Sequence, residues 1–139
     1  MAVQCTRKID FPMIDLAGIA YYPRIYDLCH RLFEDAWEQF TVYNYQQILD
    51  DIGVGFPVKH IETEFHAPIR YGDIITAEIS MSKIGSSSCV WEYSMTNQLG
   101  TLVWVSSQTT VCVDMITIQP VAIPEELRLA MVEHLLVGE

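Results

Sequence analysis

An aspartate that lies a few residues before a glycine, two tyrosines and a proline is the feature of this sequence best suited to chemistry. The stretch from Asp15 to Pro23 reads D-L-A-G-I-A-Y-Y-P, and a strongly periodic helical pattern follows it. A helix start leaves backbone N–H groups without partners, and with the positive end of the helix dipole these groups favour an anion or a developing oxyanion. We expect the free donors to be the amides of Tyr22, Arg24 and Ile25. Asp15 is then either a reactive acid held beside those donors or a loop carboxylate that only caps a turn.

The helix that follows is predicted by its apolar periodicity over residues 24–40. Apolar residues recur at i, i+3, i+4 and i+7, whereas charged residues occupy the opposite side. Pro23 suits the first helical position, because its ring fixes φ and its missing N–H would have had no partner within the helix. The predicted buried face consists of Ile25, Leu28, Cys29, Leu32, Phe33, Ala36, Trp37 and Phe40.

The composition is that of a globular chain with a substantial core. Half of the 139 residues are hydrophobic and 19% are charged, with no repeats or charge runs, so residues 1–139 are expected to form a single domain. No apolar run approaches the roughly 18 residues of a membrane span, and the N-terminus lacks the apolar region of a signal peptide, which predicts a cytoplasmic protein. The net charge of −10 argues against nucleic acid or an anionic membrane as a partner. An anionic small molecule would need some of the eight Lys and Arg residues placed beside it.

Several other chemistries lack their motifs. The four cysteines form no C-x-x-C pair and fall in predicted helix or strand positions, so we interpret them as small buried thiols rather than disulfides or zinc ligands. They are Cys5, Cys29, Cys89 and Cys112. His60 and His66 have no metal-ligand spacing and are interpreted as structural histidines. The G-x-S-x-G, P-loop and dinucleotide-binding motifs are absent, and no metal or cofactor is expected.

Extended segments account for most of the remaining chain. Runs bounded by turn residues predict a first strand before the helix and four consecutive strands after it, with short helical pieces at 45–49 and near the C-terminus. The predicted strands are 3–11, 57–65, 74–83, 88–96 and 102–113. Ile75, Ala77, Ile79 and Met81 alternate with polar residues, which is typical of a sheet buried on one face. The same buried role is expected in the last strand for Val103, Val105, Val111 and Val113.

This order of elements leaves few compact arrangements. The predicted class is α+β, with an antiparallel five-stranded sheet that wraps its apolar face around one long central helix, the hot-dog fold. The alternative is another α+β layer in which the helix packs against an open sheet.

The stretch from Asp15 to Phe40 resembles the 4-hydroxybenzoyl-CoA thioesterase family of hot-dog proteins. That family's signature is an aspartate, two residues, a glycine, an aliphatic residue and aromatic residues at the start of the long helix, as in D-L-A-G-I-A-Y-Y-P. The similarity continues through G-F-P-V at 55–58 and A-P-I-R-Y-G-D at 67–73, so it covers most of the chain. The resemblance implies hydrolysis of an acyl-CoA thioester, with Asp15 as nucleophile or general base and the N–H of Tyr22 as the donor to the oxyanion. It also implies dimers joined edge to edge through their sheets, with each active site between two subunits.

The sequence departs from that family at two positions. Met13 stands where the family often has a second acid, and Ile19 stands where a histidine commonly follows the glycine. The isoleucine version resembles the aromatic-acyl branch more than the fatty-acyl branch.

Further residues acquire candidate roles in substrate binding. Gly18 is expected to be a turn glycine that also leaves the thioester carbonyl unobstructed, and the expected pocket walls are Tyr21, Tyr22 and Phe56. The candidates for the CoA phosphates and nucleotide lie at one turn and just before the third strand, although the corresponding turn of the related aromatic-acyl enzyme is more basic. They are Lys83, Ser86, Ser87, Ser88 and Arg70.

Three functions are open at this point. The first is an acyl-CoA thioesterase, for an aromatic group such as 4-hydroxybenzoyl or alternatively a short or medium fatty acyl chain. The second is a hydratase or dehydratase, which is disfavoured because the position five beyond Asp15 is Ala20 and no histidine precedes His30. The third is a non-catalytic acyl-CoA-binding module. In each case we expect a homodimer or homotetramer, since a single unit leaves one sheet edge unpaired and half a pocket open.

Overall fold

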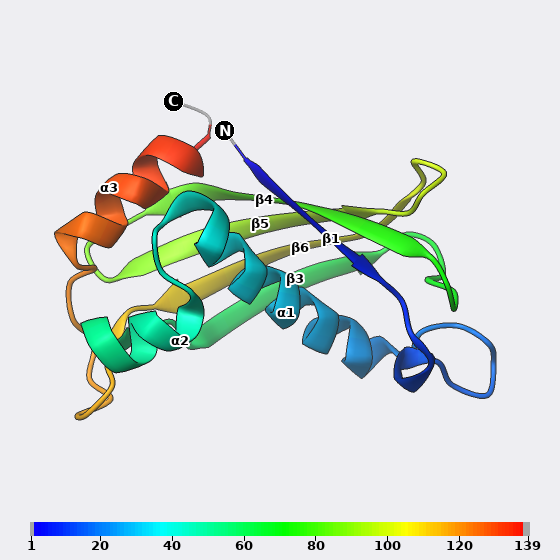
Figure 1. Ribbon diagram of the computed structural model, residues 1–139, viewed down its shortest axis with the longest axis horizontal. Helices are drawn as coiled ribbons and strands as arrows, with labels where there is room; N and C mark the ends of the chain where they lie inside the picture. The colour runs from blue at the N-terminus through cyan, green and yellow to red at the C-terminus, as the bar shows by residue number, and fades with distance from the viewer. Residues whose placement is uncertain (1, 138–139) are drawn as a thin grey trace.

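A five-stranded antiparallel sheet wraps around one long helix in the computed structural model, which describes residues 2–137 (Figure 1). In chain order the main elements are β1 (Val3–Lys8), α1 (Tyr22–Phe40), β3 (Val58–Phe65), β4 (Ile74–Ile84), β5 (Ser88–Thr96) and β6 (Leu102–Val111). The strands lie in the order β1-β4-β5-β6-β3, so β1 and β3 form the two edges. The predicted hot-dog arrangement is confirmed.

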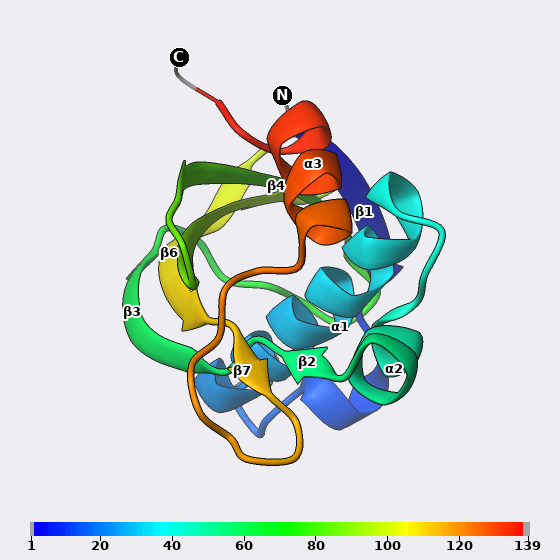
Figure 2. The ribbon, with the colours of Figure 1, turned by 90° about the vertical axis from the view of Figure 1, so that its left-hand side faces the viewer.

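Helix α1 fills the concave side of the sheet with the face that its periodicity predicts. All eight residues of that face are buried, and α1 begins at Tyr22, slightly earlier than its apolar pattern. Its 19 residues correspond to a length of about 28 Å, so it runs along most of the sheet (Figure 1). The end-on view in Figure 2 shows the sheet curving around the helix. Trp37 is fully buried and packs against Trp91 of β5 and against Phe56, with ring centroids 5.7 and 5.2 Å apart.

The inner face of the sheet matches the prediction in β4 but not in β6. Ile75, Ala77, Ile79 and Met81 are buried as expected. In β6 the buried inward positions from the middle onward are polar, and the expected face was wrong for Val105 and Val111, which are only partly buried. The inner face of β6 consists of Trp104, Ser106, Gln108 and Thr110.

Side-chain hydrogen bonds explain why the polar side of β6 can face inward. The hydroxyls of Thr63 and Ser106 are 2.8 Å apart, and the indole N–H of Trp91 donates to Thr110 Oγ1 at 2.9 Å. Burial of the large Trp104 ring decides which face of β6 points inward. The polar residues at every second position after it then also face inward, where they have hydrogen-bond partners.

The smaller elements refine the predicted boundaries. The first strand ends at Lys8 rather than at residue 11, because the chain turns through a 3₁₀ segment. The last strand is interrupted at Cys112, after which a separate two-residue strand pairs with a strand that the sequence did not indicate. These elements are Phe11–Met13 (3₁₀), α2 (Tyr45–Gln47), a π-helical turn (Ile48–Ile52), β2 (Val54–Gly55), β7 (Val113–Asp114) and α3 (Glu125–His134). Within residues 2–137, no helix combines the length and apolar character needed to cross a membrane.

Candidate active site

Asp15 lies in a tight loop that returns the chain to the start of α1. Its amide donates to the carbonyl of Ile19 at 3.1 Å, and the amide of Gly18 donates to the Asp15 carbonyl at 3.1 Å. Gly18 has φ +83°, a left-handed conformation that favours glycine. One carboxylate oxygen of Asp15, Oδ1, accepts from the amide of Ala17 at 2.8 Å, while Oδ2 accepts no hydrogen bond from the described residues. The side chain therefore caps its own loop and still presents one oxygen to solvent.

The Asp15 loop is tied to the segment that precedes β4. The amide of Ala20 donates to the carbonyl of Ile69 at 2.7 Å, Ile19 forms an isolated antiparallel bridge with Arg70, and the amide of Tyr21 donates to Met13 at 2.9 Å. These bonds hold the loop on both sides, so the backbone of Asp15 is fixed relative to the first turn of α1.

The amide of Tyr22 is the available donor at the helix start. Tyr22 is the first residue of α1, and its N–H has no acceptor among the described residues. The expectation was wrong for Arg24, whose amide donates to the carbonyl of Tyr21 at 2.8 Å. Pro23 has no N–H, so among the first three residues of α1 only Tyr22 has an amide without an acceptor in the described part of the chain.

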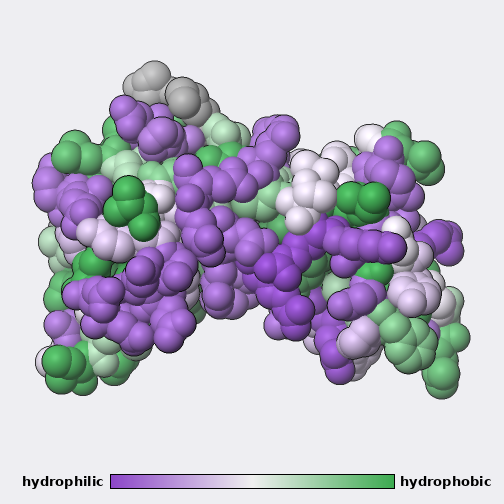
Figure 3. Space-filling model, viewed as in Figure 1, coloured by the Kyte–Doolittle hydropathy of each residue, from purple (hydrophilic) through white to green (hydrophobic). Residues whose placement is uncertain are grey.

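An open, mainly apolar cavity of about 350 Å³ adjoins this helix start. It is lined by Ile19, Ala20, Tyr22, Ile25, Phe65, His66, Ala67, Pro68 and Ile69. Tyr22 is 62% exposed, and its ring packs edge-on against that of Tyr21, with centroids 5.6 Å apart. At this end of the molecule, at the right of Figure 3, apolar patches are interspersed with polar surface.

His66 lines this cavity, although its sequence context predicted only a structural role. Its Nε2 lies 3.1 Å from Oε1 of Glu64, and its side chain is partly exposed at the cavity wall. The available signal was its position directly before the A-P-I-R-Y-G-D segment, which packs on the Asp15 loop. His60 instead pairs with Glu62 on the exposed edge strand.

A second, smaller cavity of about 170 Å³ lies farther along α1, between that helix and strands β3, β5 and β6. It is lined by Tyr26, Cys29, His30, Phe33, Phe56, Val58, Ile61, Tyr93, Gln108 and Thr110. Phe56 belongs to this cavity, so it does not share a wall with Tyr22 as the sequence suggested. Tyr26 joins the two cavities, because its ring contacts Phe65 of the first (centroids 6.5 Å) and lines the second.

The residues expected to bind CoA lie near opposite ends of strand β4. Arg70 bridges to the Asp15 loop, whereas Lys83 and the serines at 86–88 lie at the far end of β4, about 30 Å away at the usual rise of a strand (Figure 1). At that far turn, Arg128 of α3 donates to the carbonyls of Gly85 and Ser86 at 2.7 and 2.8 Å. The sequence did not single out Arg128, since it lies 43 residues after Gly85 and 42 after Ser86.

The cysteines are buried free thiols, as predicted. Burial raises the pKa of the Cys29 thiol to about 12 and that of Cys5 to about 11, which keeps both protonated and unreactive. The described residues contain no group of three or more His, Cys, Asp or Glu side chains that could hold a metal ion.

Comparisons with known proteins match nearly the whole chain. A family model described as the thioesterase-like superfamily matches residues 14–131. The 1,4-dihydroxy-2-naphthoyl-CoA hydrolase of Thermosynechococcus vestitus is 26% identical over 121 residues, which cover 87% of this chain and 82% of that protein. A thioesterase-superfamily structure from Jannaschia is similar with a TM-score of 0.90 at 18% identity, covering 98% of this chain and 94% of that one. A structure of 4-hydroxybenzoyl-CoA thioesterase complexed with 4-hydroxybenzoyl-CoA gives a TM-score of 0.84 at 18% identity, covering 94% and 98%. The structural similarities establish the shared fold.

Proposed function

This chain belongs to the thioesterase-like superfamily, and we propose that it hydrolyses the thioester bond of acyl-CoA substrates with an aromatic acyl group, releasing the free acid and CoA. The observation that supports this most directly is the Asp15 loop. A carboxylate with one free oxygen and an unpaired helix-start amide occur in one short stretch of chain, and Tyr22, which carries that amide, lines an apolar cavity.

The proposed chemistry uses Asp15 and the amide of Tyr22. The thioester carbonyl enters the cavity so that its oxygen accepts from the Tyr22 N–H, which stabilises the negative charge that develops during attack. Asp15 either attacks the carbonyl carbon, giving a mixed anhydride that water then hydrolyses, or removes a proton from an attacking water. On both routes the C–S bond breaks and CoA leaves as a thiolate.

An aromatic acyl group suits the walls of the two cavities. Tyr22 and Phe65 line the first cavity, and Tyr26 leads into the second. Edge-on or stacked ring contacts contribute about 0.5–1.5 kcal/mol beyond the area buried, which corresponds to a preference of about tenfold or less over an aliphatic group of equal size. The 1,4-dihydroxy-2-naphthoyl-CoA hydrolases among the relatives also act on an aromatic acyl-CoA.

We further propose that the active unit is a dimer formed through β3. This edge strand exposes Val58, Ile61 and Phe65, and an unpaired edge can add a strand from a second copy. In a two-fold dimer the two β3 strands would pair antiparallel, so the partner's strands would run in the opposite direction to those of this chain. The β4–β5 turn of the partner would then lie at the end of the sheet where this chain has Asp15. The turn containing Lys83 and the serines would then serve the active site of the other subunit, which reconciles those candidates with their distance from Asp15.

The test is release of CoA thiol from a panel of acyl-CoAs, followed with a chromogenic thiol reagent. We expect 4-hydroxybenzoyl- and benzoyl-CoA to be hydrolysed with higher kcat/KM than hexanoyl- and palmitoyl-CoA. Palmitoyl-CoA as the best substrate would contradict the aromatic preference. Tight binding of aromatic acyl-CoAs without turnover would instead favour a non-catalytic binding module.

A further inference from the structure

The second cavity has room for one aromatic ring. Its volume is about 170 Å³, and apolar cavities of about 150 Å³ in proteins bind benzene. It opens between α1 and the edge strand β3, where Val58 and Ile61 are only about half buried. The cavity therefore has the size of one ring.

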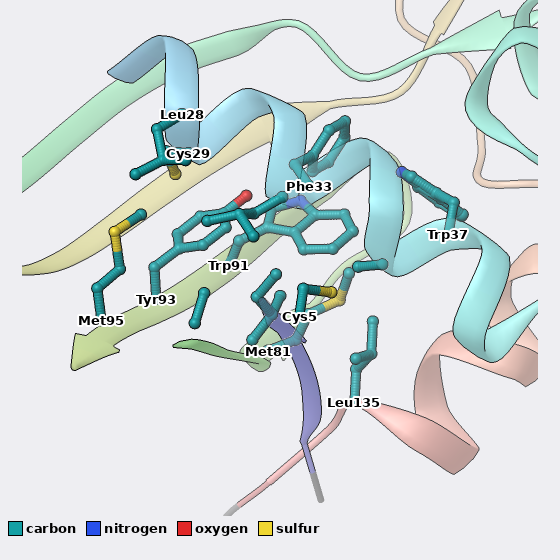
Figure 4. Close-up of a cluster of buried hydrophobic side chains, with 14 of the residues drawn as sticks. Cys5, Leu28, Cys29, Phe33, Trp37, Met81, Trp91, Tyr93, Met95 and Leu135 are labelled. Carbon is teal, nitrogen blue, oxygen red and sulfur yellow. The ribbon is translucent and has the colours of Figure 1, made fainter. Parts of the chain in front are cut away.

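Polar groups interrupt the apolar lining on the side formed by the sheet. Gln108 is only 7% exposed and lies on the inner face of β6 between Ser106 and Thr110. Tyr93 extends from β5 toward α1 and interacts with the Cys29 thiol (Figure 4). A cavity that bound only hydrocarbon would gain nothing from these groups, since each buried polar group without a partner costs about 1–3 kcal/mol.

The amide of Gln108 is satisfied by the protein at one end only. Its Nε2 donates to Ser106 Oγ at 3.2 Å and is 3.6 Å from Cys29 Sγ, whereas Oε1 accepts no hydrogen bond from the described residues. Rotating the amide by 180° would exchange these roles, because Ser106 and Cys29 can each donate as well as accept. In either orientation one polar end of the amide is left for the cavity. A ligand hydroxyl group can pair with the Gln108 amide in either orientation, because a hydroxyl can both donate and accept a hydrogen bond.

The neighbouring hydroxyls differ in what they can offer a ligand. Thr110 Oγ1 already accepts from the Trp91 indole at 2.9 Å and lies 3.3 Å from the Cys89 thiol. Burial raises the pKa of Tyr93 well above its usual value, so its hydroxyl stays protonated and remains a hydrogen-bond donor. Gln108 is therefore the group best placed to recognise a ligand hydroxyl, with Tyr93 beside it.

The cavity lies at a suitable depth for the far end of an acyl group. Cys29, which faces Gln108, is seven residues beyond Tyr22, or about 10 Å along the helix axis. An aromatic acyl group whose carbonyl lies at the Tyr22 amide would thus extend past Tyr26 toward Gln108.

We propose that Gln108 recognises a hydroxyl substituent on the aromatic ring of the acyl group, so that this protein prefers hydroxylated aromatic acyl-CoAs to unsubstituted ones. This inference rests on the proposed thioesterase function, which supplies the acyl-CoA substrate. Gln108 contacts the substituent and not the reacting carbonyl, so it determines specificity without taking part in the chemical step.

The experiment compares kcat/KM for 4-hydroxybenzoyl-CoA and benzoyl-CoA in the wild type and in Gln108→Met, which keeps the length of the side chain but removes the amide. We expect the wild type to favour the hydroxylated substrate by about tenfold and Gln108→Met to reduce that ratio to near one. Gln46→Met, the same change at an exposed position of α2, should leave the ratio unchanged. Gln108→Met with normal turnover and the wild-type ratio would overturn the proposal.

A binding experiment on the wild type separates this inference from the proposed function. Backbone amide shifts of the protein would be followed while p-cresol or toluene is added. We expect p-cresol to bind about tenfold more tightly, with the largest shifts at Cys29 and Gln108. If no acyl-CoA is hydrolysed, the thioesterase proposal fails. The comparison of p-cresol with toluene still decides whether the cavity binds a hydroxylated ring more tightly than an unsubstituted one. Equal binding of the two compounds, or shifts confined to other regions, would overturn the inference even if Gln108→Met does not fold.

Discussion

Replacing Asp15 by asparagine should abolish most turnover while leaving the fold intact. The Oδ1 atom of asparagine can still accept from the Ala17 amide, so the hydrogen bond that closes the loop at 2.8 Å is preserved. The free Oδ2 becomes an NH₂ group, which is neither a base nor an effective nucleophile. The substitution thus removes the reactive oxygen without removing the structural one.

The expected effect on kcat is a decrease of at least about a thousandfold, equivalent to about 4 kcal/mol of activation free energy. The binding affinity for a non-hydrolysable thioether analogue of the substrate should change little, because the cavity walls are untouched. Single-turnover and steady-state release of CoA thiol would give the rate, and calorimetry with the thioether analogue would give the affinity.

A matched control is Asp50→Asn, which makes the same chemical change at an exposed position of the π-helical turn. It should retain wild-type turnover and affinity. An Asp15→Asn variant with a normal melting temperature and near-normal kcat would refute the assignment of Asp15 and leave it as a loop cap only.

Four further outcomes are expected. His66→Gln should lower kcat/KM by no more than about fivefold, since a thiol of pKa near 8.5 leaves without a proton donor; a thousandfold loss in the steady-state assay would make His66 catalytic. Gly18→Ala should lower the free energy of unfolding by about 1 kcal/mol in urea titrations, because its φ of +83° strains a side chain although no atom lies within 4 Å of the added Cβ. Light scattering at micromolar concentration should give at least twice the chain mass of 15.9 kDa, and a monodisperse monomer would contradict the dimer. Raised pKa values predict that a thiol reagent at pH 8 modifies Cys5 and Cys29 only after unfolding, and rapid labelling of the native protein would contradict their burial.

The sequence predicted the elements that carry strong periodicity. The eight apolar positions of α1 and the alternation in β4 each admit one phase, because any other phase would expose large side chains. The Asp15 loop was also found from sequence, since its glycine, tyrosines and proline mark a turn and a helix start within nine residues. The fold and the position of the candidate acid followed from these local signals.

The predictions that were wrong depended on contacts between distant parts of the chain. The valines of β6 suggested the wrong inner face, because the stabilising partners of Ser106, Gln108 and Thr110 lie on α1, β3 and β5. The Arg24 amide is not available because the first turn of α1 places it 2.8 Å from the carbonyl of Tyr21. The position of Lys83 relative to Asp15 depended on the length and direction of β4, which residue types alone do not give.

The two interpretations of Asp15 that the sequence left open are compatible in the structure. A catalytic carboxylate must be held in place, and the bond from the Ala17 amide to Oδ1 provides that constraint from within the loop. The backbone bonds from Ala20 to Ile69 and from Tyr21 to Met13 then fix the loop against the rest of the protein. The hydrogen bond to Oδ1 fixes the orientation of the whole carboxylate, and therefore also the position of the free Oδ2. The structural role of Asp15 is thus a condition for the catalytic role proposed for it.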